Sequence, residues 1–204
     1  MNKMSKICVT GASGFIGNSL CKLLSLSDKS IRGFVRVLDE NQISSGIEYV
    51  PVGDISLDLN WIDLLKGFDC VVHCAGKAHD VSEKKNVDIY RLVNTEGTKI
   101  LAEQAAKAGV KRLVFLSSVK VNGESLYKIN KNNIFKNIDS ADPQDAYSMS
   151  KFEAEKILWE ISLKTGLEVV IVRLPLVYGK NVKGNLEKLI KIVKLGIPLP
   201  LSLV

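Results

Sequence analysis

The chain has 204 residues, of which 46% are hydrophobic, and its formal net charge is +6. This length is enough for one well-buried domain and part of another. No stretch approaches the ~20 apolar residues of a membrane span, and no secretory apolar region precedes the first predicted strand, so we expect no membrane insertion and a cytoplasmic location. The lysines are spread out without interleaved aromatic residues, which favours a solvated surface first, an anionic small molecule second and nucleic acid a distant third.

Four cysteines, Cys8, Cys21, Cys70 and Cys74, lie in or beside apolar segments. They form no CxxC pair and have no histidine-rich cluster as a partner in the sequence. We therefore expect buried free thiols in a reducing compartment, rather than disulfides or a metal site.

Short apolar runs alternate with helical stretches through most of the chain. The runs are too apolar to be solvated on one face, so they predict strands of a buried parallel sheet. These strands are expected at 6–10, 31–37, 47–52, 70–75, 111–118 and 168–174. Helices are expected at 15–26, 59–66, 87–108 and 146–165. The alternation predicts a doubly wound parallel α/β sheet of the Rossmann type.

The first predicted strand runs into the sequence TGASGFIG at 10–17, which opens a helix. Glycines permit a tight turn and a close approach of backbone amides to a pyrophosphate, and a helix N-terminus adds partial positive charge. The alternative is an ordinary glycine-rich turn, but the strand–turn–helix context favours dinucleotide binding. The residues expected to contact the cofactor here are Gly11, Ser13, Gly14, Phe15, Ile16 and Gly17.

The end of the second strand is where an acidic residue would bind the ribose 2′-hydroxyl of NAD(H). This sequence instead has Val35 followed by Arg36, with Arg32 upstream and Asp39 and Glu40 just beyond. A guanidinium suits a 2′-phosphate, so NADP(H) is favoured over NAD(H), and a simple surface arginine is the alternative.

Tyr147 and Lys151 stand four residues apart on the predicted helix 146–165, with Asp142-Pro143 before it. Side chains at i and i+4 are neighbours, so the ammonium is expected to lower the pKa of the phenol and make it a proton donor or acceptor. The alternative is a core stripe along which the lysine extends. Ser118, at the carboxyl end of the fifth strand, could bind a substrate oxygen or simply cap a turn.

The polar segment 123–142 predicts a long loop over the site. After Gly179 the alternation stops, and one more helix precedes an apolar end of the chain. We therefore predict a dinucleotide-binding Rossmann domain at 1–179 and the beginning of a truncated substrate-binding lobe at 180–204.

Seven motifs together resemble the extended short-chain dehydrogenase/reductases, the NAD(P)-dependent epimerases, dehydratases and reductases of nucleotide-sugars. They are TGASGFIG, GDI at 53–55, VVHCAGKAH at 71–79, NTEGT at 94–98, LSSVKVNG at 116–123, YSMSK at 147–151 and RLPLVYG at 173–179. The motifs cover nearly the whole chain in the expected order, which makes the resemblance more specific than any one of them.

The resemblance implies a catalytic triad of Ser118, Tyr147 and Lys151, with the tyrosine and lysine also contacting the cofactor. It further implies cofactor contacts by residues at or after four strand ends and by one residue of the helix 87–108, namely Asp54, Ile55, Ala75, Gly76, Ser117, Pro175, Val177 and, on the helix, Asn94. Substrate contacts are implied for His79, Ser118 and Asn185, although the first and last could equally be ordinary loop and cap residues. A homodimer through the helices 87–108 and 146–165 is also implied, but their apolar faces are equally explained by packing on the sheet.

The two residues directly after Ser118 limit which reaction of this family is expected. Sugar dehydratases of this family have Asp-Glu there, whereas this chain has Val119 and Lys120, so dehydration is disfavoured. The chain resembles the branch that reduces UDP-4-keto-6-deoxy-N-acetylhexosamines at C4 for surface polysaccharide synthesis, which makes an NADPH-dependent reductase the favoured function. A UDP-hexose 4-epimerase with bound NAD is the close alternative, and a non-catalytic NADP-binding regulator is the second.

Overall fold

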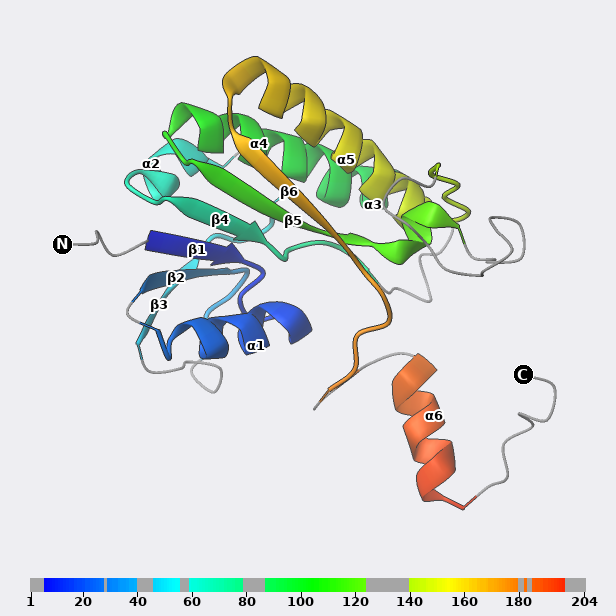
Figure 1. The fold of residues 1–204 in the computed structure, drawn as a ribbon. Coiled ribbons are helices and arrows are strands. Elements are labelled where there is room, and N and C mark those ends of the chain that lie inside the picture. The colour runs from blue at the N-terminus through cyan, green and yellow to red at the C-terminus, as the bar shows by residue number, and fades with distance from the viewer. Residues whose placement is uncertain are drawn as a thin grey trace.

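The computed structural model describes residues 6–27, 29–39, 46–55, 59–78, 87–123, 140–179, 182 and 185–196. Six strands form one parallel sheet in the order β3-β2-β1-β4-β5-β6 (Figure 1). They are β1 Lys6–Thr10, β2 Ser30–Val35, β3 Ile47–Pro51, β4 Cys70–His73, β5 Arg112–Ser118 and β6 Glu168–Leu174. The chain changes direction across the sheet between β1 and β4, so the predicted doubly wound fold is confirmed and its ligand edge lies beyond these strands.

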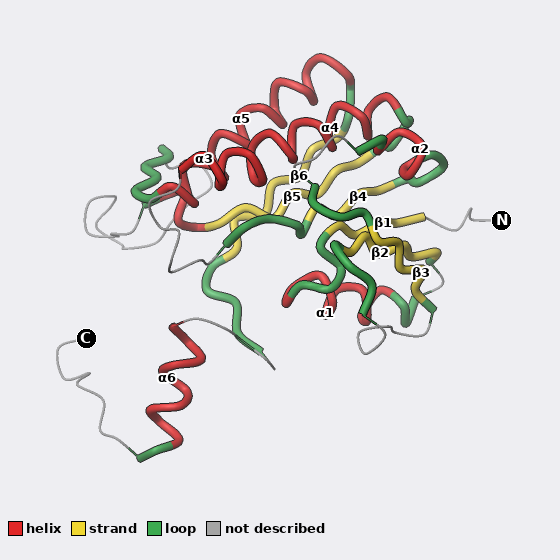
Figure 2. The backbone as a smooth tube through the Cα atoms, turned by 180° about the vertical axis from the view of Figure 1, so that it is seen from behind, coloured by secondary structure: helices red, strands yellow, loops and turns green. Residues whose placement is uncertain are grey.

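Helices cover the two faces of the sheet unequally (Figures 1 and 2). The helices are α1 Phe15–Leu24, α2 Trp61–Leu65, α3 Val87–Tyr90, α4 Gly97–Lys107, α5 Ala146–Thr165 and α6 Asn185–Lys194. Helices α2, α4 and α5 lie on one face, and α1 lies on the other, beside β1 to β3. Two irregular turns, η2 Arg91–Glu96 and η3 Val119–Asn122, complete the described elements.

The predicted helix 87–108 is interrupted by η2, which has π-helical geometry. The Gly97 amide bonds the carbonyl of Leu92, and the Thr98 hydroxyl donates to the Asn94 carbonyl at 2.6 Å. A wide turn of this kind leaves carbonyls that need other donors, and Thr98 supplies one. The sequence pattern could not reveal it, because the apolar spacing continues through the turn.

Helix α5 has the bounds predicted from the sequence, Ala146–Thr165, and it begins shortly after the Asp142-Pro143 pair. Asp145 is the N-cap, and its Oδ1 accepts from the Ser148 amide at 2.6 Å while the Asp145 amide donates to Ser148 Oγ at 3.1 Å. This reciprocal cap satisfies two amides that the helix itself cannot. The helix ends as predicted at Gly166, whose φ of 78° favours glycine.

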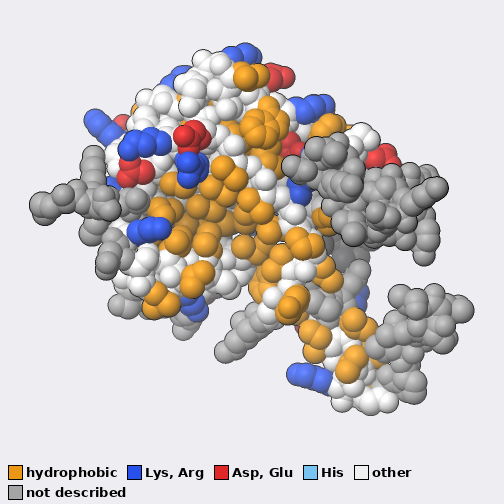
Figure 3. All heavy atoms as spheres, viewed as in Figure 1, with side chains coloured by type: hydrophobic (Ala, Val, Ile, Leu, Met, Phe, Trp, Pro, Cys, Tyr) orange, Lys and Arg blue, Asp and Glu red, His pale blue; other side chains and the backbone are white. Residues whose placement is uncertain are grey.

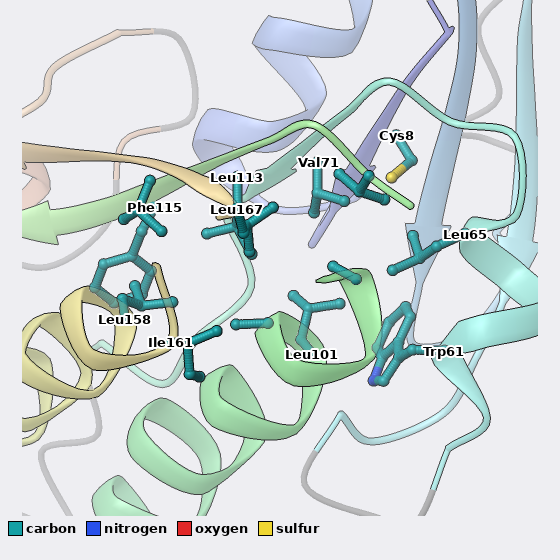
Figure 4. Close-up of a cluster of buried hydrophobic side chains, with 14 of the residues drawn as sticks. Cys8, Trp61, Leu65, Val71, Leu101, Leu113, Phe115, Leu158, Ile161 and Leu167 are labelled. Atoms are coloured by element: carbon teal, nitrogen blue, oxygen red, sulfur yellow. The ribbon is translucent and has the colours of Figure 1, made fainter. Parts of the chain in front are cut away.

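The main hydrophobic core lies between the sheet and helices α2, α4 and α5. Figure 4 shows Leu113 and Phe115 of β5 facing Leu101 of α4 and Leu158 of α5, and Trp61 closes one end of this cluster. All five side chains are 1% exposed or less. This packing holds the carboxyl ends of β4 and β5 in place against the helix that carries Tyr147.

The other face of the sheet is only partly covered. In Figure 3 hydrophobic side chains gather over the middle of this side of the molecule. Val170 of β6 alternates with the core residue Val169, so it points to this other face, and it is 40% exposed. Leu176, beyond β6, is 72% exposed. Contiguous apolar surface of this kind usually packs against further protein.

None of the described helices is long and apolar enough to cross a membrane.

All four cysteines carry free thiols. Cys8 and Cys21 are buried, whereas Cys70 and Cys74 are half-buried. Burial raises the pKa of Cys21 to about 11 and that of Cys74 to about 12. These thiols are therefore protonated and unreactive at neutral pH.

Candidate active site

The glycine turn after β1 has no room for side chains at two positions. A Cβ on Gly17 would lie 2.1 Å from the Gly11 carbonyl oxygen, and a Cβ on Gly11 would lie 2.7 Å from the Ala75 amide nitrogen. Gly11 also has φ +66°, a conformation that favours glycine. The turn therefore brings the start of α1 into direct contact with the residues after β4.

The start of α1 is open to an anion. Gly14 is the N-cap, and within the described part of the chain no side chain caps the helix and no acidic residue lies in its first turn. Ser13 precedes this cap, and Phe15 and Ile16 begin the helix. A bare helix N-terminus behind a turn that a Cβ would fill fits the pyrophosphate of a dinucleotide.

The two arginines near the end of β2, Arg32 and Arg36, lie in different surroundings. Arg32 is half-buried and already paired, because its Nη2 lies 2.9 Å from Glu48 Oε2 and its Cζ lies 4.8 Å from the Phe68 ring centroid. Arg36 is exposed beyond β2, and its carbonyl accepts from the Gly53 amide at 3.1 Å. Asp54 and Ile55 follow that amide, so the segments predicted to contact the adenosine end are brought together.

Asn94 holds the segment that follows β4. Its Oδ1 accepts from the Lys77 amide at 2.8 Å, and its Nδ2 donates to the Lys77 carbonyl and to Ser150 Oγ, both at 3.0 Å. Ala75 and Gly76 immediately precede Lys77 and border the glycine turn. The side-chain amide of Asn94 thus fixes the backbone beside the crevice, the edge of the sheet beyond the carboxyl ends of β1, β4 and β5 where such folds bind ligands.

The three predicted catalytic residues lie at the carboxyl ends of β4 and β5. Ser118 ends β5, and a side-chain hydrogen bond joins it to Tyr147 in the first turn of α5. Lys151 is 5% exposed; its Nζ donates to the Leu116 carbonyl at 3.0 Å and lies 4.5 Å from the Phe115 ring centroid. A Cβ on Gly76 would lie 3.2 Å from that ammonium, so the ammonium lies directly beside the segment after β4 that borders the glycine turn.

The expectation that Lys151 lowers the pKa of Tyr147 is wrong in this structure. Burial raises the pKa of Tyr147 above its ordinary value, and the nearby Asp145 carboxylate adds to the increase. The Ser118 hydrogen bond and the Lys120 ammonium oppose it. The Lys151 ammonium instead binds the Leu116 carbonyl, so the phenol remains a proton donor at neutral pH.

Ser117 faces the opposite side of the sheet from Ser118. Its hydroxyl donates to Glu155, which is 3% exposed and pairs with Arg173 Nη2 at 2.6 Å. Arg173 Nη1 also donates to Asn122 Oδ1 at 3.1 Å. The predicted cofactor contact of Ser117 is thus not available to its hydroxyl, which instead ties β5 to α5 and β6.

A buried histidine that the sequence reasoning missed joins the glycine turn to η2. His73 is 1% exposed, and burial lowers its pKa to about 3, so the imidazole is neutral. Because Thr98 donates to the Asn94 carbonyl, its Oγ1 accepts from His73 Nε2 at 2.9 Å, which leaves Nδ1 to accept from Thr10 Oγ1 at 2.6 Å. A histidine among the apolar residues of a buried strand was the signal for this network.

The remaining predicted residues are placed only in part. Pro175 is exposed and Val177 half-buried after β6, and Gly179 comes close to Phe15, since a Cβ there would lie 3.5 Å from its Cζ. His79 and most of the predicted loop at 123–142 lie outside the described residues. Asn185 begins α6, but its side chain is also outside them.

The buried ammonium leads to a prediction about stability. Burial lowers the pKa of Lys151 from 10.5 to about 8, so below pH 8 the folded chain holds a charge that prefers water. We expect Lys151→Met to increase the free energy of unfolding at pH 7 by on the order of 2 kcal/mol. The folded pKa is depressed, so the advantage over wild type should shrink as the pH rises from 8 towards 10.5.

Urea unfolding of both proteins across this pH range measures the difference. Lys156→Met on the exposed face of α5 is the matched control, and we expect it to change stability little. A destabilised Lys151→Met protein would contradict the prediction.

Known proteins share this fold and these motifs. The NAD dependent epimerase/dehydratase family matches residues 7–201. A UDP-glucose 4-epimerase of Vibrio cholerae is 43% identical over 202 residues, which cover 97% of this chain and 60% of that protein. An N-acetyl-alpha-D-glucosaminyl-diphospho-ditrans,octacis-undecaprenol 4-epimerase of Escherichia coli O157:H7 is 32% identical, over 91% of this chain and 53% of that protein.

A solved structure with the same fold is that of MoeE5 in complex with UDP-glucose and NAD. It is 26% identical to this chain, with a TM-score of 0.79, and the match covers 96% of this chain and 63% of MoeE5. The chain thus spans between 53% and 63% of the length of these relatives. The family match over nearly all of the described sheet, together with the motifs, shows that the chain belongs to the NAD dependent epimerase/dehydratase family, the extended short-chain dehydrogenase/reductases.

Proposed function

We propose that the chain provides the cofactor and catalytic part of an NAD(P)-dependent enzyme that oxidises and reduces C4 of a UDP-sugar, as a UDP-hexose 4-epimerase. One observation carries this proposal: Ser118, Tyr147 and Lys151 converge beside the glycine turn at the ligand edge of the sheet. The names of the relative from Vibrio cholerae and of the ligands of MoeE5 support a UDP-hexose.

Residues of this chain would transfer the proton to and from the substrate. Ser118 would hold the oxygen on C4 by a hydrogen bond, and Tyr147 would accept the hydroxyl proton on oxidation and return it on reduction. Lys151 would donate to the ribose beside the nicotinamide from its place beside the segment after β4. The bound nicotinamide supplies hydride acceptance and donation.

A 4-keto-sugar reductase is the second candidate, and two observations favour it. Tyr147 keeps its proton at neutral pH, as a donor to a carbonyl oxygen must. Arg36 stands exposed at the end of β2, where it suits the 2′-phosphate of NADPH. The substrate class would be a UDP-4-keto-6-deoxy-N-acetylhexosamine, and a role in surface polysaccharide synthesis stays a prediction.

Product analysis separates these functions. We expect UDP-glucose to give UDP-galactose without net cofactor use if the protein is an epimerase, whereas loss of NADPH with the 4-keto sugar indicates the reductase.

Tyr147→Phe should lower either rate by at least ~100-fold, because the proton relay is lost. Tyr49→Phe is the control, since its buried hydroxyl has no hydrogen-bond partner among the residues that the structure describes. Cofactor binding without turnover of either sugar would favour the regulator, and full activity of Tyr147→Phe would refute the mechanism.

We further propose that Arg36 gives a preference for NADP(H). We expect Arg36→Ala to weaken NADPH binding by about 10- to 100-fold and to leave NADH binding nearly unchanged, because only NADPH has the phosphate to pair with. Fluorescence titration of both cofactors measures this. Arg112→Ala, which removes an exposed arginine at the opposite end of the sheet, is the control. Tighter binding of NADH than NADPH by wild type would overturn the preference.

We also propose a homodimer through α4 and α5. A groove of about 700 Å³ runs between these helices, with Ala106 and Ile157 at its base and Lys99, Glu103 and Lys164 among the charged residues around it. Sedimentation equilibrium should give a dimer for wild type and a monomer for Ile157→Lys, with circular dichroism as the check on folding. A monomeric wild type at micromolar concentration would contradict the proposal.

We also propose that the cofactor-binding domain ends at residue 179. Residues 1–179 would bind the cofactor, and 180–204 would begin the lobe that selects the sugar. Helix α6 fits such a role, since Leu189, Ile190 and Val193 leave its apolar side exposed. A cytoplasmic location stays a prediction.

A further inference from the structure

An ion pair joins the two elements that carry Ser118 and Tyr147. Lys120 lies in η3, two residues after Ser118, and Asp145 is the N-cap of α5, two residues before Tyr147. Lys120 Nζ and Asp145 Oδ2 are 2.8 Å apart, and the two side chains are 42% and 39% exposed. The pair thus bridges the serine turn and the tyrosine helix at the same edge of the sheet.

Both partners also bind the catalytic elements directly. The Lys120 amide donates to Ser118 Oγ at 3.2 Å, which leaves the hydroxyl hydrogen of the serine to be donated elsewhere. Asp145 uses Oδ1 for the Ser148 amide and Oδ2 for Lys120, so both of its oxygens are bound. These bonds hold the pKa of Asp145 below its usual value, although burial alone would raise it.

The charges around the phenol come from several elements. Asp145 opposes ionisation of Tyr147, as does Tyr90 of α3, whose ring centroid is 6.3 Å away. Lys120 of η3 and the hydrogen bond from Ser118 of β5 favour it. Lys151, on the same helix, points to the Leu116 carbonyl instead. Among the described side chains, Lys120 therefore supplies the positive charge that offsets Asp145.

We propose that Lys120 is a positioning residue: it holds the cap of the tyrosine helix against the serine turn and balances the Asp145 carboxylate beside the reacting phenol. The proposal rests on the role of Tyr147 in proton transfer given above. If Lys120 is removed, the Asp145 carboxylate, two residues before Tyr147, loses its paired cation. Ionisation of Tyr147 should then need a higher pH. Oxidation of the substrate alcohol uses the phenolate, so its rate should also rise only at a higher pH than in wild type.

Four variants test the idea. Lys120→Met removes the cation, Lys120→Arg keeps it, and Asp145→Asn removes the carboxylate while keeping a residue that caps helices well. The double variant Lys120→Met with Asp145→Asn removes both charges. Lys111→Met is the matched control, because Lys111 makes an ion pair of the same 2.8 Å length with Asp69 just before β5, at the opposite edge of the sheet.

The first measurement is the pH-dependent absorbance of the tyrosines, taken as the difference between each protein and the same protein carrying Tyr147→Phe. It needs neither substrate nor cofactor, so it remains informative if the proposed function fails. We expect the Tyr147 transition to move to higher pH in Lys120→Met and to lower pH in Asp145→Asn. Lys120→Arg, the double variant and Lys111→Met should stay close to wild type.

The second measurement is the pH profile of kcat for alcohol oxidation. Lys120→Met should lose activity several-fold at neutral pH and recover much of it at high pH, with KM changed little. A loss that is equal at every pH, and equal in the double variant, would mean that the pair only braces the fold. That result, or an unmoved Tyr147 transition in Lys120→Met, overturns the proposal. A wild type with no turnover but with the predicted shifts would refute the function and leave the positioning role intact.

Discussion

A buried ammonium is the constraint on which the arrangement of the site depends. Lys151 sits beside the crevice with the Leu116 carbonyl and the Phe115 ring as its main contacts, in a place that lowers its pKa to about 8. Such a charge is kept only where surrounding packing is strong enough to offset its desolvation. The core between β5, α4 and α5 supplies that packing, so stability gained from apolar contacts offsets the cost of burying this charge.

A chain of neutral hydrogen bonds complements this charge. It runs from Thr10 through His73 and Thr98 to the carbonyl of Asn94, whose side chain in turn reaches Ser150 and the segment after Gly76. Each hydroxyl both donates and accepts, so the network has one consistent direction. The cofactor turn and the tyrosine helix are thereby oriented by a group that stays uncharged at cellular pH.

The fold and the main residues of the site were predictable because they depend on local patterns. Apolar runs gave the six strands, and the glycine spacing and the positions of Ser118, Tyr147 and Lys151 gave the crevice. The electrostatics were not predictable, since helical spacing indicates that Lys151 is near Tyr147 but not that its ammonium turns towards Leu116. The bonds of Glu155 with Ser117 and Arg173 also join distant parts of the chain, and no local pattern encodes them. The π-helical turn η2 was missed for a different reason, because its bonds are local but the apolar spacing of a regular helix continues through it.

The crowded glycine turn has a consequence for redesign. A Cβ on Gly17 would lie 2.1 Å from the Gly11 oxygen, and a Cβ on Gly11 would lie 2.7 Å from the Ala75 amide nitrogen, so neither position in the turn has room for a side chain. Arg36 and its neighbours are exposed and border open solvent. On the proposed binding mode, an exchange of one nicotinamide cofactor for another would be engineered at the rim beyond β2, away from the residues proposed for the reaction.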